Sequence, residues 1–129
     1  MALVAGVLAA SGCGGGGSKP YTATGTAPCL RTKGFTKVTT DPVKTGFIAG
    51  FAENGGIRAT SPTGNVVTIA FAADEASAAS TRQAFRRHAP PALRPHLNDV
   101  MSSQRNAVLV WTVTPDPGQL ADADACLHP

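Results

Sequence analysis

Side chains that could carry out acid–base, nucleophilic or metal chemistry are few and widely spaced in this 129-residue chain. Of the eight carboxylates, Asp74, Glu75 and Asp116 are expected at helix starts, and Asp122 and Asp124 on a solvated helix face. The three histidines show no H-x-x-H or H-E-x-x-H spacing for a metal ion. The sequence contains no G-x-S-x-G elbow and no P-loop. We therefore expect no catalytic residues, no metal and no cofactor.

A basic stretch is the one patterned surface feature. Six basic or titratable residues fall within fifteen positions with no acid among them: Arg82, Arg86, Arg87, His88, Arg94 and His96. They could contact anionic lipid headgroups, at about 1 kcal/mol per basic residue near the surface, or an acidic envelope polymer. The alternative is a solvated helix face. A net charge of +3 is too small for the basic clusters of nucleic-acid binders, so no nucleic-acid partner is expected.

The segment Phe47–Gly56 is a second possible site. Phe47 and Phe51 lie among glycines and could form a mobile lip over the pocket of a small-ligand-binding protein or an enzyme. A concave pocket with several convergent polar groups would support that reading. The alternative is that both phenylalanines fill the core.

An uncharged apolar run at residues 2–10 leads into Ser11, Gly12 and Cys13. This stretch resembles the bacterial prolipoprotein signal, with Ala10-Ser11-Gly12-Cys13 at the position of the lipobox. The resemblance implies that residues 1–12 are removed, and that Cys13 is acylated and holds the chain on the outer face of a membrane. Alternatively, Ala10-Ser11-Gly12 is an ordinary cleavage site that releases a soluble secreted protein, or the segment is an apolar terminus without a targeting role.

Acylation of Cys13 would leave Cys29 and Cys126 as a pair. Outside the cytoplasm such a pair is expected to oxidise, and the resulting disulfide would close nearly the whole domain. A zinc site would need C-x-x-C or similar pairs, which the sequence lacks. Two buried free thiols are the remaining alternative.

The length supports one domain, which we place at residues 28–129 after a flexible Gly/Ser/Thr linker at 13–27. Residues 43–56 fit either a strand or a loop. We expect helices at 28–34, at 75–88 and after Asp116-Pro117, and strands at 35–40, 57–61, 65–73, 97–103 and 107–114. This order predicts an α+β fold in which two or three helices cover one face of a small, mostly antiparallel sheet of four or five strands. The disulfide would join the first and last helices.

These features together favour an envelope-anchored lipoprotein with a small, non-catalytic binding or accessory domain. It would lie on the extracytoplasmic face of a membrane, held by its N-terminal lipid. An envelope protein or an acidic polymer would be its further partner. The Phe47–Gly56 segment and the arginines Arg82, Arg86, Arg87 and Arg94 are the alternative sites.

Overall fold

The computed structural model describes residues 18–129, so the predicted signal at 1–12 and Cys13 lie outside the described residues. Its centre is a five-stranded antiparallel sheet with the strand order β1-β2-β3-β5-β4. The strands are β1 Thr36–Thr39, β2 Gly56–Thr60, β3 Val66–Phe71, β4 Met101–Gln104 and β5 Ala107–Trp111. The predicted α+β class and antiparallel sheet are confirmed.

Three longer helices correspond to the predicted ones: α1 Ala23–Thr32, α4 Glu75–His88 and α6 Pro117–Cys126. Asp74 caps α4 and Asp116 caps α6, each carboxylate accepting a backbone N–H three residues on, at 2.7 and 2.8 Å. Three single-turn helices were not predicted: α2 Pro42–Thr45, α3 Phe47–Gly50 and α5 Leu97–Val100, the last preceded by a 3-10 turn, η1, at Arg94–His96.

Helix α1 begins five residues before the predicted start at Pro28. Thr22 caps it, its hydroxyl accepting the N–H of Gly25 at 3.0 Å, and Pro28 lies inside the helix. The buried stripe Ala23, Thr26, Ala27 and Leu30 packs against the sheet. This packing outweighs the signal by which a proline marks a helix start. Residues 23–27, which the sequence placed in the linker, are therefore part of helix α1.

The segment 97–103, predicted as one strand, divides into α5 and β4. Leu97 and Val100 are both buried and stand three residues apart, the spacing of one helix face. Strand pairing with β5 starts only at Met101.

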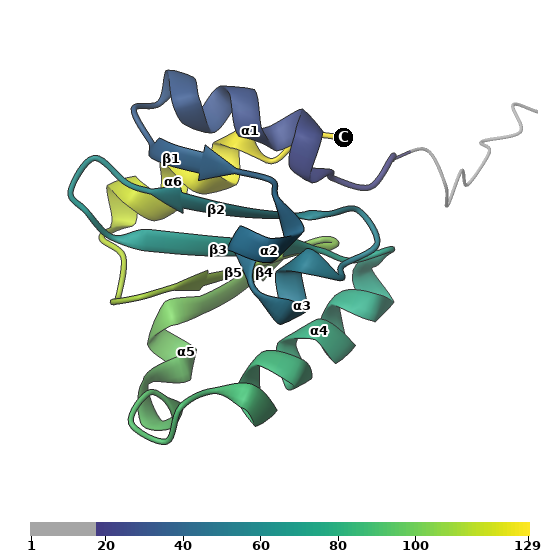
Figure 1. The fold of residues 1–129 in the computed structure, drawn as a ribbon, viewed down its shortest axis with the longest axis vertical. Helices are drawn as coiled ribbons and strands as arrows, with labels where there is room; N and C mark the ends of the chain where they lie inside the picture. Colours follow the sequence, from purple (N-terminus) through teal and green to yellow (C-terminus); the bar gives the residue numbers. More distant parts are fainter. Residues whose placement is uncertain (1–17) are drawn as a thin grey trace, which may run out of the picture.

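The sheet is covered on both faces, which corrects the prediction of one covered face. The first face carries the odd-numbered side chains of β2, β3 and β5, among them Ile57, Ile69 and Trp111, and packs on α1 and α6. Trp111 lies in this core. On the second face α2, α3 and α4 lie over the even-numbered positions (Figure 1).

Small residues let the helices approach the second face closely. A Cβ built on Gly56 would lie 2.5 Å from the carbonyl oxygen of Ala49 in α3, so only glycine fits there. Ala78 of α4 packs against Ala72 and Val108. Both faces of strands β3 and β5 are thus at least partly buried, as the apolar composition of these strands requires.

A disulfide joins Cys29 in α1 to Cys126 in α6, as predicted, with a Cα–Cα distance of 5.2 Å and a sequence separation of 97 residues. The C-terminal tail adds to this contact. The backbone N–H of His128 donates to the Thr26 hydroxyl at 3.1 Å, and the His128 carbonyl accepts from the N–H of Thr22 at 2.9 Å.

Reducing this disulfide is expected to lower the free energy of unfolding by about 4–5 kcal/mol at most, because the bond restricts a loop of nearly the whole domain in the unfolded chain. Urea unfolding of the oxidised protein and of a Cys29→Ser/Cys126→Ser variant measures the difference. Intact mass before and after reduction is the control for the bond itself. Equal unfolding midpoints would contradict the expectation.

Candidate functional site

An apolar groove on the second face of the sheet is the strongest candidate site. Its floor contains Thr68 of β3 and Val110 of β5, which are register partners. Two adjoining hollows of about 390 and 140 Å³ make up the groove, and both are lined by Ile48 of α3 and by Phe85 and His88 of α4. We call this feature the α3–α4 groove.

The groove exists because α3 and α4 leave its floor uncovered. Ala78 is the one buried residue of α4, whereas Phe85, two turns later, is only half-buried. Helix α3 has four residues and buries only Ala49. Ala89, Pro90 and Leu93 of the turn after α4, together with Leu97 of α5, close one end of the groove. The polar side chains of the lining are few: Thr45, Thr68 and His88.

Two aromatic rings from the predicted segment Phe47–Gly56 stand at the surface beside this groove. Phe47 is 76% exposed and Phe51 80% exposed, and their ring centroids lie 5.2 Å apart. Phe47 lines the mouth of the groove, and Ile48 lines both hollows. The alternative in which Phe47 and Phe51 fill the core is therefore wrong. After Phe51, residues 52–55 form a turn that bonds to β3 through Asn54, and Gly56 begins β2.

The predicted basic patch is exposed, but most of its guanidinium groups contact neutral protein groups. Arg82 donates to the Ser103 hydroxyl at 2.9 Å and Arg86 to the Asn98 side-chain oxygen at 3.1 Å. Arg94 donates to the Ala89 carbonyl at 3.1 Å. Arg87 has no side-chain partner within residues 18–129. The contacts of Arg82 and Arg86 connect α4 to β4 and α5, and none of the arginines forms an ion pair with an acid in the part of the chain that the structure describes.

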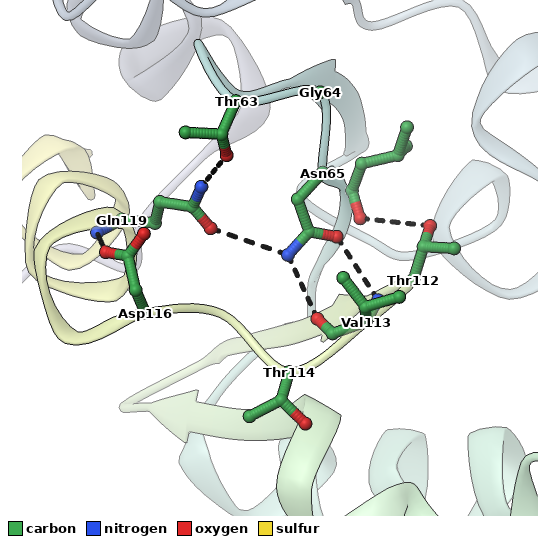
Figure 2. Close-up of a pocket in the computed structure, with 9 residues that line it drawn as sticks. Thr63, Gly64, Asn65, Thr112, Val113, Thr114, Asp116 and Gln119 are labelled. Atoms are coloured by element: carbon green, nitrogen blue, oxygen red, sulfur yellow. Dashed lines mark hydrogen bonds between the residues drawn. The ribbon is translucent and has the colours of Figure 1, made fainter.

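A polar hollow of about 430 Å³ lies where the β2–β3 turn meets the start of α6 (Figure 2). Asn65, 8% exposed, is its centre. The Asn65 amide nitrogen donates to the Val113 carbonyl at 2.9 Å, and its amide oxygen accepts the Val113 N–H at 3.2 Å. Gln119 donates to the Thr63 hydroxyl and accepts from Asn65 at 3.5 Å. Because both Asn65 amide atoms are used internally, the hollow is a structural joint rather than a ligand site.

The titratable groups form no catalytic arrangement in the described part of the chain. Burial raises the pKa of Asp124, one of whose side-chain oxygens is buried without a hydrogen-bond partner. Asp124 was predicted on a solvated helix face and is instead half-buried. The hydrogen bond from the Ser77 backbone lowers the pKa of Asp74 at the helix cap. Among residues 18–129, no three His, Cys, Asp or Glu side chains could hold a metal ion together.

Comparison with known proteins adds no family. No family model, curated protein or solved structure matches this chain. None of the helices between residues 18 and 129 is long and apolar enough to cross a bilayer.

The sequence predicted a site at the Phe47–Gly56 segment, which contributes one wall of the groove. It did not predict the wall formed by α4 and the residues after it. Phe85 of α4 is half-buried, packs against the cluster of Ala72, Ala78 and Val108, and borders both hollows. Val110 and Leu97 belonged to predicted strands whose neighbours could not be assigned. The one sequence signal for the groove was the apolar segment 47–51 among glycines. This segment is too short to cover two strands of the sheet.

Replacing Asn65 by alanine is expected to lower the free energy of unfolding by about 1–3 kcal/mol, because the amide and carbonyl of Val113 lose their partner. Gln119→Ala is the matched control at the same joint, and a smaller loss is expected because its contact with Thr63 is exposed. Chemical unfolding of the three proteins measures both effects. A larger loss for Gln119→Ala than for Asn65→Ala would overturn the assignment.

Proposed function

We propose that this chain is an exported lipoprotein, anchored through acylated Cys13, whose domain is a non-catalytic binding module. The Cys29–Cys126 disulfide supports export, because disulfides persist in oxidising compartments and are rare in the cytosol. The same bond accounts for two of the three cysteines and leaves Cys13, at the end of the lipobox-like stretch, as the third.

The α3–α4 groove carries the binding part of the proposal. Binding pockets are concave, mostly apolar and furnished with a few polar groups, which describes this lining. Because the two hollows adjoin and share three residues, the space favours an elongated apolar ligand such as an acyl chain. His88 lies in both linings, and its ring nitrogens can form hydrogen bonds with the carboxylate end group of such a ligand.

The anchoring proposal predicts the mass and the location of the mature protein. Expressed in a bacterial host with residues 1–12, the protein should have an intact mass that corresponds to a chain starting at Cys13 plus acyl groups. A Cys13→Ser variant should move to the soluble fraction. Its retention in washed membranes, or a wild-type chain without acyl mass, would refute acylation at Cys13.

The groove proposal predicts saturable binding of a long-chain polyene fatty acid whose fluorescence rises in apolar surroundings. Ile48→Arg should weaken binding by roughly tenfold or more, since it places a charge on the wall common to both hollows. Val113→Arg is the matched control, because Val113 is exposed and lies outside the groove. Titrations of purified protein, with circular dichroism to confirm folding, decide between the outcomes. Equal affinity of wild type and Ile48→Arg would exclude the groove.

A further inference from the structure

Exposed apolar side chains concentrate on the two short helices beside the groove. Four large apolar side chains are exposed within residues 18–129, and three of them lie on α2, on α3 or directly after α3: Val43 at 89%, Phe47 and Phe51. Single exposed apolar residues are common on protein surfaces, but a contiguous cluster indicates an interaction surface. The rings of Phe47 and Phe51 lie in contact, and Val43 belongs to the short helix that precedes them. We call these three residues the apolar platform.

Three cations lie beside Val43 of the platform, on the side of β1. A hollow of about 730 Å³ between α2 and the sheet edge is lined by Lys37, Lys44 and Arg58, and Val43 belongs to the same lining. None of these cations forms an ion pair within residues 18–129, where the one ion pair joins Lys33 and Asp122.

The backbone at the edge strand shapes this basic rim. Lys37 has a φ of 50°, which is uncommon for a residue other than glycine, at a register shift in β1. Bulges of this kind redirect side chains and occur next to functional sites.

Two acids belong to the same segment. Asp41 accepts the N–H of Val43 at 2.9 Å as the cap of α2, and Glu53 is exposed beyond α3. The platform and its rim therefore combine protruding apolar groups with a small excess of positive charge. This combination is typical of surfaces that insert into the interfacial region of an anionic bilayer.

The platform lies near the point where the chain enters the domain. Tyr21 pairs with Asn106, whose side chain also donates to the Ala72 carbonyl at 2.9 Å. The same carbonyl accepts from the side chain of Asn54 at 2.9 Å, and Asn54 follows Phe51 by three residues. The Asn54 carbonyl in turn accepts the N–H of Ala23 at 3.0 Å.

Chain connectivity then limits the distance to the anchor. Ser18 follows Cys13 by five positions, and an extended chain of that length spans about 18 Å at most. A lipid on Cys13 would hold this end of the domain, with the platform, close to the bilayer surface. Two weak contacts on one molecule reinforce each other through their effective concentration.

We propose that the apolar platform inserts into the interface of an anionic phospholipid bilayer while Lys37, Lys44 and Arg58 contact lipid phosphates. The orientation depends on the proposed anchoring at Cys13, whereas the contact itself does not. Phe47 belongs to both the platform and the groove, so bilayer contact would place the mouth of the groove at the lipid surface.

The test uses the full chain with a Cys13→Ser change, so that acylation cannot contribute to vesicle binding. Whether the wild-type chain is acylated is measured separately, from its intact mass. The protein should float with vesicles of equal parts phosphatidylglycerol and phosphatidylcholine, and much less with phosphatidylcholine alone. A further Phe47→Ser/Phe51→Ser change should weaken binding by roughly tenfold or more, because the inserted apolar area is lost. No flotation with anionic vesicles would overturn the proposal.

Charge variants separate this surface from the arginines of α4. Lys37→Ser/Lys44→Ser should reduce binding several-fold, whereas Arg86→Ser/Arg87→Ser, with the same loss of charge, should change it little. The opposite order would assign the contact to α4 and refute the platform. As an independent measurement, the tryptophan fluorescence of a Phe51→Trp variant should shift to shorter wavelengths when anionic vesicles are added. A Val113→Trp control should not.

Discussion

The close packing of short helices on a sheet face of small residues is the constraint on which the rest of the structure depends. Gly56 admits the backbone of α3, and Ala72 with Val108 admits α4 at Ala78. These contacts bury only parts of the second face. Neither α3 nor α4 covers the Thr68–Val110 pair, which lies between these contacts. The α3–α4 groove is the space that the two helices leave over this pair. The opposite face has no such gap, because α1 and α6 cover it and a disulfide connects them.

The same short helices explain why apolar side chains stand in solvent. A four-residue helix makes little more than one turn, so it can direct one residue to the sheet and must direct the others outward. Ala49 is the buried residue of α3, and Phe47 and Phe51 point away from the core. The hydrogen bonds of Asn54 and Asn106 to the Ala72 carbonyl bring the turn after α3 to the start of the domain. The groove and the platform adjoin at Phe47, which belongs to both.

Local sequence signals located the longer elements well. Asp74 and Asp116 marked the starts of α4 and α6 because capping is a contact within one turn. The predictions that were wrong depended on tertiary contacts. Pro28 suggested a helix start, yet the stripe Ala23–Leu30 extends the helix past it. Leu97 and Val100 looked like strand residues until their burial at a three-residue spacing defined α5. Asp124 looked solvated, and packing on the sheet half-buries it.

By itself the sequence determined the α+β class, the antiparallel sheet, the helix caps and the Cys29–Cys126 pair, because periodicity, capping and cysteine parity are properties of the chain alone. Only the tertiary structure decided that helices cover both faces of the sheet, that Phe47 and Phe51 are exposed, and that Ile48 and Phe85 line the same groove. The physical reason is that a groove is an unfilled space between elements distant in sequence. Its existence depends on how closely those elements approach.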